Sequence, residues 1–143
     1  MVVSKFIVPH SLEFTHKESY PSREIGVTLS IQLQCGLESV TIHAKVDTGA
    51  QNCIFQREYA DILGLELESG VRQEFSTVVG GFTAFGHEIT ITACGMEVHA
   101  MAYFAENGDY RLNVLGLMGW LDRFHIALDH YNATLYLRYA GDQ

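Results

Sequence analysis

The sequence contains little proline and little positive charge. Its 143 residues include 2 prolines, Pro9 and Pro21, so no proline interrupts a strand or a helix after residue 21. Lys and Arg number 9 against 17 Asp and Glu, which gives a formal net charge of -8. Because an acidic chain repels phosphate backbones, we expect no nucleic-acid partner.

Long apolar runs and paired cysteines are missing as well. No apolar run approaches the ~20 residues that span a bilayer. Residues 1–10 lack the small-residue cleavage site of a secretory signal, so we expect no membrane partner. The 3 cysteines, Cys35, Cys53 and Cys94, are odd in number and widely spaced, which excludes a disulfide framework. They indicate packed thiols in a reducing compartment, and we expect a cytoplasmic protein.

Motifs for a metal, a cofactor or a thiol nucleophile are also lacking. None of the 7 histidines lies in a His-Glu-x-x-His pattern or beside a Cys-x-x-Cys pair, so we expect no metal and no cofactor. Cys53 follows Asp47 closely in the chain but has no identifiable His partner, and we interpret it as a packed thiol.

The sequence does contain many short segments in which apolar and polar residues alternate. This period of two is typical of half-buried strands, and glycine-containing turns separate the segments. Residues 56–63 favour a short helix that ends before Gly64, and residues 117–124 favour a helical turn. The pattern predicts an all-β, closed barrel or sandwich with one or two short helices. The expected strands are residues 27–34, 40–46, 71–79, 82–92, 98–104, 112–115, 125–128 and 134–139.

Residues 1–25 differ from the rest because they carry little pattern and contain both prolines. We expect an N-terminal arm or an extra strand there. Residues 26–143 show no internal repeat and no linker, which predicts a single domain.

The most informative stretch is Asp47-Thr48-Gly49-Ala50, which follows the expected strand 40–46. A carboxylate at this point is pushed towards the interior, which costs free energy unless donors reach it. Gly49 has no Cβ, so backbone N–H groups are able to approach the carboxylate of Asp47. Asp-Thr-Gly also occurs as an ordinary turn at the end of a strand, in which Asp bonds the backbone two residues on.

Three motifs, in this order along the chain, resemble those of the single-domain, retroviral-type (retropepsin-like) aspartic peptidases, and bacterial members in particular. They are Val46-Asp47-Thr48-Gly49-Ala50, then Val78-Val79-Gly80-Gly81-Phe82, then Asn113-Val114-Leu115-Gly116 leading into Trp120-Leu121. The resemblance covers roughly residues 26–139. It implies a closed, barrel-like retropepsin-type fold for the domain 26–143.

The resemblance also implies roles for these residues. Asp47 would be the catalytic residue, supported by Thr48, Gly49 and Ala50. A flap that bends over an extended peptide would consist of Val79, Gly80, Gly81 and Phe82, with the glycines at the tip of the hairpin.

The sequence departs from the pattern of the retroviral members in two respects. Leu117 stands where they usually carry Arg, and Gln51 and Asn52 stand where the acidic partner of that Arg is expected. The charged brace is therefore missing on both sides, and retroviral-style dimer contacts do not follow from the sequence.

The mechanism of this family requires two carboxylates, but this chain has one Asp followed by Thr or Ser and Gly. The resemblance therefore implies a homodimer in which two Asp47 carboxylates meet and activate a water that hydrolyses a peptide or protein substrate. A non-catalytic peptide-binding or dimerisation module on the same fold is the first alternative. An unrelated β-barrel that binds a small ligand is the second.

Overall fold

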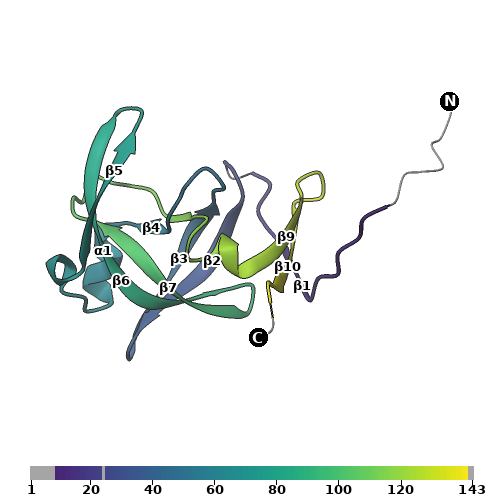
Figure 1. Cartoon of the computed structure of the whole chain (residues 1–143), viewed down its shortest axis with the longest axis horizontal. Coiled ribbons are helices and arrows are strands. Elements are labelled where there is room, and N and C mark those ends of the chain that lie inside the picture. The colour runs from purple at the N-terminus through teal and green to yellow at the C-terminus, as the bar shows by residue number, and fades with distance from the viewer. Residues whose placement is uncertain (1–8, 24, 142–143) are drawn as a thin grey trace.

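The computed structural model describes residues 9–23 and 25–141. Residues 1–8 and 24, which belong to the expected N-terminal arm, lie outside the described residues, as do residues 142 and 143. The described chain is built mainly from β-strands (Figure 1). No helix among the described residues is long and apolar enough to cross a membrane.

The chain enters the main sheet through a hairpin. Strands β2 (Thr28–Cys35) and β3 (Glu38–Val46) are antiparallel, with Ile31 opposite Ile42. Every second residue of β2 from Leu29 to Leu33 is buried, which is the outcome that the alternating pattern predicts. The turn between the strands requires a positive φ at Gly36, which is +59°.

This sheet closes on itself. Its strand order is β2-β3-β8-β4-β7-β6-β5, and β2 also pairs with β6. The remaining strands are β4 (Ile54–Phe55), β5 (Val71–Thr77), β6 (Gly80–Ala93), β7 (Met96–Ala105) and β8 (Val114–Leu115). One side of the ring is made by β4 and β8, which have 2 residues each, so the barrel is irregular. The expected all-β, closed barrel-like fold is confirmed.

Helical structure is short, as expected. Helix α1 (Arg57–Ile62) follows β4, and Gly64 beyond its end has a φ of +72°. Two 3-10 turns, η1 (Leu67–Ser69) and η2 (Leu121–Arg123), complete the helical elements of the described chain. The helical turn expected over residues 117–124 is thus confined to η2. The reason is that Gly119 has a φ of +106° and Trp120 a φ of -136°, neither of which is helical, so regular helical structure begins only at Leu121.

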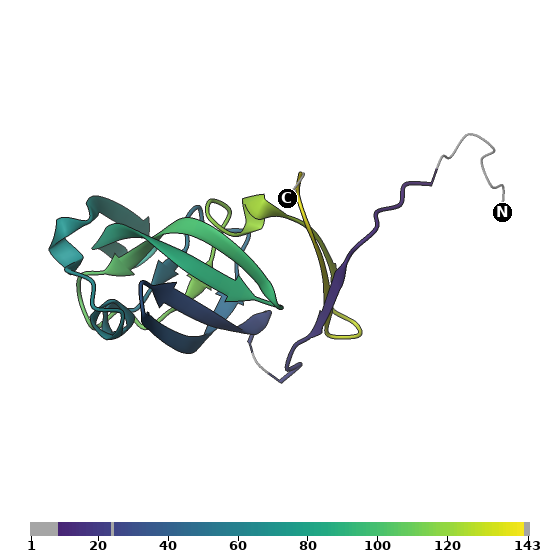
Figure 2. The same cartoon turned by 90° about the horizontal axis from the view of Figure 1, so that it is seen from below.

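A second, three-stranded sheet lies at one end of the barrel (Figure 2). It consists of β9 (Phe124–Asp129), β10 (Thr134–Tyr139) and β1 (His16–Ser19), with β10 in the centre. The expected C-terminal hairpin is therefore present, and part of the expected arm adds a strand to it. The Tyr139 hydroxyl accepts a hydrogen bond from the N–H of Glu97 at 2.9 Å and donates one to its carbonyl at 3.0 Å, which ties the sheet to the barrel.

Candidate active site

Asp47 lies directly after β3, where two segments far apart in sequence run side by side. Strand β3 pairs in parallel with β8, with Val46 opposite Leu115. The N–H of Asp47 continues this pairing by donating to the carbonyl of Leu115 at 3.0 Å. The backbone of Asp47 is therefore fixed by the barrel.

The carboxylate of Asp47 is held by the turn that follows it. The N–H of Gly49 donates to Oδ1 at 2.8 Å, and a Cβ at Gly49 would lie 3.1 Å from that same oxygen. The N–H of Ala50 donates to the carbonyl of Asp47 at 3.2 Å. This is the donor arrangement that the sequence predicts, although a plain Asx turn has the same bond. Thr48 is exposed, and its hydroxyl has no hydrogen-bond partner within the described residues.

The loop that follows Asp47, residues 48–53, is held in place by the segment after β8. The carbonyl of Ala50 accepts a hydrogen bond from the N–H of Leu117 at 2.9 Å. Gly116 passes so close to this loop that a Cβ there would lie 2.2 Å from the carbonyl oxygen of Asn52. A glycine is therefore necessary at position 116 because backbone meets backbone.

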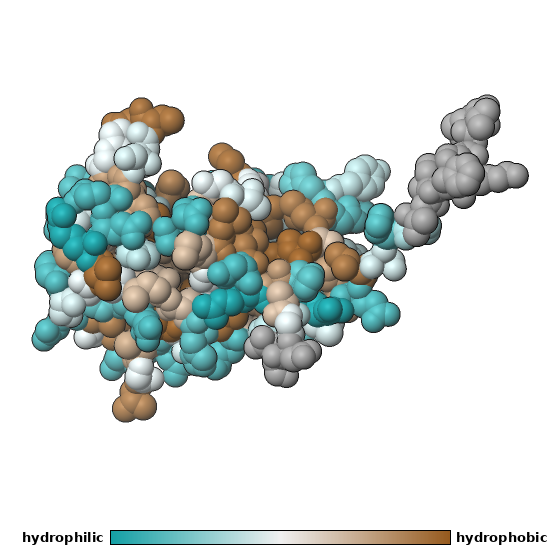
Figure 3. Space-filling view, viewed as in Figure 1, coloured by the Kyte–Doolittle hydropathy of each residue, from teal (hydrophilic) through white to brown (hydrophobic). Residues whose placement is uncertain are grey.

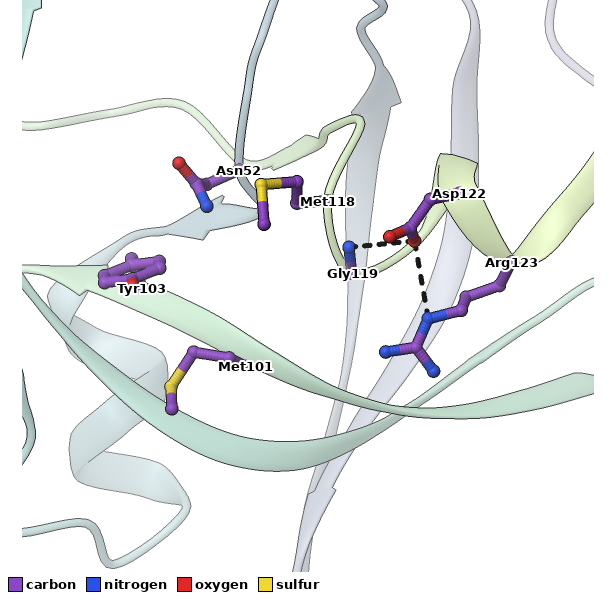
Figure 4. A pocket seen from close by; sticks show the side chains of 7 residues that line it. All are labelled: Asn52, Met101, Tyr103, Met118, Gly119, Asp122 and Arg123. Carbon is purple, nitrogen blue, oxygen red and sulfur yellow. Dashed lines mark hydrogen bonds and ion pairs between the residues drawn. The ribbon is translucent and has the colours of Figure 1, made fainter.

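The charged brace of retroviral members is absent from this region, as the sequence indicates. The Leu117 side chain is 39% exposed, and Asn52 bridges to Met118 through the backbone. Figure 4 shows the small cavity behind this loop, where the carboxylate of Asp122 accepts from the N–H of Gly119 at 3.1 Å. Its volume of 180 Å³ is below the roughly 300–1,000 Å³ of ligand pockets, so we do not take it as a binding site.

A larger cavity opens over the carboxylate of Asp47. It has a volume of 340 Å³ and lies between the loop after Asp47, the β5–β6 hairpin and the segment 110–114. Its lining is largely apolar and comprises Asp47, Gly49, Ala50, Gln51, Ile54, Phe75, Ser76, Thr77, Phe82, Tyr110, Leu112 and Val114. A second cavity of 510 Å³ adjoins it, and both volumes fall in the range of ligand pockets.

Most of the expected site residues line one or both of the two cavities. The cavity beside Asp47 holds Gly49, Ala50 and Phe82 as well. The outer cavity is lined by Val79, Gly80, Gly81 and again Phe82. Thr48 lines neither cavity.

The expected position of the hairpin tip is wrong by two residues. Strand β5 ends at Thr77, and the turn consists of Val78 and Val79, so that Gly80 already pairs with Thr77 and Gly81 with Ser76. Both valines keep a negative φ, and the positive φ of +134° falls on Gly80 directly after the turn. Hairpins often place a glycine at this point, because the chain must leave the turn in a conformation that other residues rarely adopt.

Sequence reasoning identified Phe82 but missed Phe75 and Tyr110, the other two aromatic residues that line the cavity beside Asp47. Tyr110 follows the polar loop 106–109 and packs on Phe82, with ring centroids 4.8 Å apart. Burial, and to a lesser degree the charge of Asp47, raises the pKa of Tyr110 to about 12. The position of Tyr110 directly after a polar loop was the only sequence signal for it, but the neighbouring residues do not indicate which strand its ring contacts.

The thiol that lies near Asp47 in sequence is not part of the site. Cys53 is fully buried, and burial raises its pKa to about 11, so the interpretation as a packed thiol agrees with the structure. No three His, Cys, Asp or Glu side chains gather around a possible metal position in the part of the chain that the structure describes.

Comparisons with known proteins identify the architecture. The structure is similar to a retropepsin-like aspartic protease from Rickettsia conorii, with a TM-score of 0.57 and 24% sequence identity over 80% of this chain and 100% of that one. It is also similar to the EIAV protease in complex with the inhibitor HBY-793, with a TM-score of 0.52 and 18% identity over 66% of this chain and 85% of that one. No family model and no curated protein matches the sequence.

The chain has the retropepsin-like fold. This excludes the unrelated β-barrel, which was the second alternative. At these identities the likeness establishes the fold, and the activity has to be argued from the site.

Proposed function

We propose that the chain is an aspartic-type endopeptidase that acts as a homodimer. One observation carries the proposal: the carboxylate of Asp47, held by the N–H of Gly49 at 2.8 Å, lines a largely apolar cavity of 340 Å³ beneath a projecting hairpin. We assign this function to residues 26–143 and regard residues 1–25 as an arm that adds β1. Thr48 is proposed to support the catalytic loop together with Gly49 and Ala50.

The substrate class follows from the shape and lining of the two cavities. An extended peptide fits a cleft that lies beneath a strand hairpin, because its backbone groups are free to hydrogen-bond to the hairpin. The β5–β6 hairpin would bend at Gly80 and Gly81 and close over the peptide, which expels water from the space above Asp47. Apolar side chains on both sides of the cleaved bond suit the apolar walls.

The chemistry needs the carboxylates of two Asp47 residues, because each chain has one such motif. Two carboxylates about 3 Å apart share one proton, since two like charges at that distance cannot both stay ionised. The ionised carboxylate takes a proton from water as the water oxygen attacks the peptide carbon. The protonated carboxylate donates to the carbonyl oxygen. The C–N bond then breaks, and a proton passes to the leaving amine nitrogen.

Partner and compartment proposals rest on the sequence and on the thiols. The expected partners are a peptide or protein substrate and a second copy of this chain. The net charge of -8 argues against nucleic acid. The three cysteines are free, which suits a reducing compartment such as the cytoplasm.

The test is cleavage of a mixed peptide library by the wild type and by Asp47→Asn. Asn is isosteric with Asp but cannot accept the proton from water, so we expect cleavage to be lost and the fold retained. Asp61→Asn, at an exposed carboxylate on α1, is the matched control and should cleave like the wild type. Substantial activity in Asp47→Asn would contradict the proposal.

Two further measurements separate the alternatives. A wild type that binds a statine-containing peptide but cleaves no peptide would be a binding module on the same fold. Sedimentation velocity tests the shared site, because an active monomer would refute a dyad made from two copies.

A further inference from the structure

The cavity beside Asp47 and the outer cavity share a wall. Four residues line both cavities, namely Thr77, Phe82, Tyr110 and Leu112. Phe82 comes from β6 and Tyr110 from the loop after β7, so the wall is formed where the hairpin meets that loop. The centroids of the two rings are 4.8 Å apart and their planes are inclined at 34°.

The ring of Tyr110 is the last in a row of aromatic contacts. Phe82 stacks on Phe75 of β5 at 5.4 Å, and Phe75 meets the edge of Tyr103 of β7 at 5.4 Å. Tyr103 is buried in the barrel, so the row runs from the core to the mouth of the cleft. Aromatic pairs prefer such offset and edge contacts, which hold the Tyr110 ring in one place.

We propose that Tyr110 is a specificity-determining residue: its ring, held on Phe82, separates the cavity beside Asp47 from the outer cavity and limits the size of the substrate side chain that binds next to the cleaved bond. This inference rests on the proposed function. It adds to that function a residue that touches the substrate and was not among the expected site residues.

The geometry of an extended peptide explains why the wall between the two cavities would affect substrate specificity. Side chains two residues apart point to the same face and are separated by about 6.8 Å. One such side chain would enter the cavity of 340 Å³ and the next the cavity of 510 Å³. Without the ring of Tyr110 only Thr77, Phe82 and Leu112 remain in the shared wall, so a bulky group next to the cleaved bond would gain room towards the outer cavity.

The test measures kcat/KM for peptides that differ only in the side chain next to the cleaved bond, with Phe compared against the larger Trp. We expect Tyr110→Ala to raise the Trp-to-Phe ratio of kcat/KM by about tenfold or more, which is the range that pocket shape achieves. Tyr110→Phe keeps the ring and should stay near the wild-type ratio. Tyr131→Ala, at a tyrosine that is 97% exposed in the β9–β10 hairpin, is the matched control.

The melting temperature of each variant separates specificity from folding. A lower melting temperature in Tyr110→Ala with an unchanged ratio would overturn the inference, because Tyr110 would then be merely structural. If Tyr110→Ala does not fold, Tyr110→Leu tests the same change, since a narrower, non-planar side chain also opens the partition.

The outcomes also separate this inference from the proposed function. Cleavage by the wild type with equal ratios in wild type and Tyr110→Ala would overturn the inference alone. A wild type that neither cleaves the peptides nor binds their statine-containing counterparts would overturn both.

Discussion

Replacing Gly116 by Ala tests how tightly the loop after Asp47 packs against the segment after β8. The φ of Gly116 is not positive, so alanine there causes no backbone strain of its own. The new Cβ destabilises the protein only through its close contacts. That Cβ would lie 2.2 Å from the carbonyl oxygen and 2.5 Å from the carbonyl carbon of Asn52, and 2.8 Å from the carbonyl oxygen of Ala50. All three atoms belong to backbone, which cannot rotate away as a side chain does. The segment after β8 must therefore move off the loop.

The expected cost combines overpacking with lost hydrogen bonds. Overpacking a tight site costs about 1–3 kcal/mol. Two backbone hydrogen bonds hold the two segments together, from Leu117 to Ala50 at 2.9 Å and from Met118 to Gln51 at 2.8 Å. Each contributes about 1 kcal/mol. We expect Gly116→Ala to lower the free energy of unfolding by roughly 3–5 kcal/mol, a large part of the 5–15 kcal/mol typical of a domain.

Thermal and urea denaturation measure this loss, which corresponds to about 10–20 °C in Tm for a domain of this size. Gly108→Ala is the matched control, because a Cβ there meets nothing within 4 Å and its φ is not positive. It should stay within about 0.5 kcal/mol of the wild type. Peptide cleavage should fall further in Gly116→Ala than in the control, since Asp47 bonds to Leu115 next to the displaced residue. Equal stability of the two variants would refute the close approach.

Three further outcomes are expected. Gly80→Ala should lower kcat/KM and lower Tm by a few degrees, because a side chain at a φ of +134° costs about 1–2 kcal/mol although its Cβ meets nothing within 4 Å. A Tm loss as large as that of Gly116→Ala, with normal kinetics, would place Gly80 in the scaffold. A disulfide reagent at pH 8 should label the half-buried Cys35 in the folded protein, while the fully buried Cys53 reacts only after unfolding; rapid labelling of Cys53 would contradict its burial. Burial raises the pKa of Cys53 from 9.0 to about 11 and that of Tyr110 from 10.0 to about 12. The unfolded chain thus loses these protons first, and the free energy of unfolding should fall from about pH 9 upwards. Urea denaturation should show a shallower fall in Cys53→Ala, and a rise with pH in the wild type would exclude this linkage.

The sequence predicted best what depends on neighbouring residues. The alternation in residues 27–34 and 40–46 places one face of each strand in the core, and a shift by one residue would expose every buried side chain. Asp47 and Gly49 are two residues apart, so their hydrogen bond is also a local matter. These parts of the fold and of the site could therefore be predicted from the sequence alone.

Contacts between segments that are distant in the sequence could not be predicted in this way. The hydrogen bond from the N–H of Leu117 to the carbonyl of Ala50 joins residues 67 positions apart. The contact between Tyr110 and Phe82 likewise depends on how the loop after β7 folds back on β6. Local propensity contains no information on either approach, because both are set by the closure of the barrel.

At the hairpin tip, the residues predicted from the local sequence are not those that the structure places there. Hydrophobic burial favours valines inside and glycines at a turn, yet Val78 and Val79 are 105% and 94% exposed. Figure 3 shows hydrophobic residues at the end of the projecting hairpin. Burying one such side chain stabilises a protein by about 1.5–3 kcal/mol, and neither valine makes this contribution in the structure. The same gain becomes available when the hairpin closes on a peptide or meets a second copy of the chain. On the proposed function, the exposed valines would favour closure over a bound substrate, and Gly80 after them would allow the tip to bend.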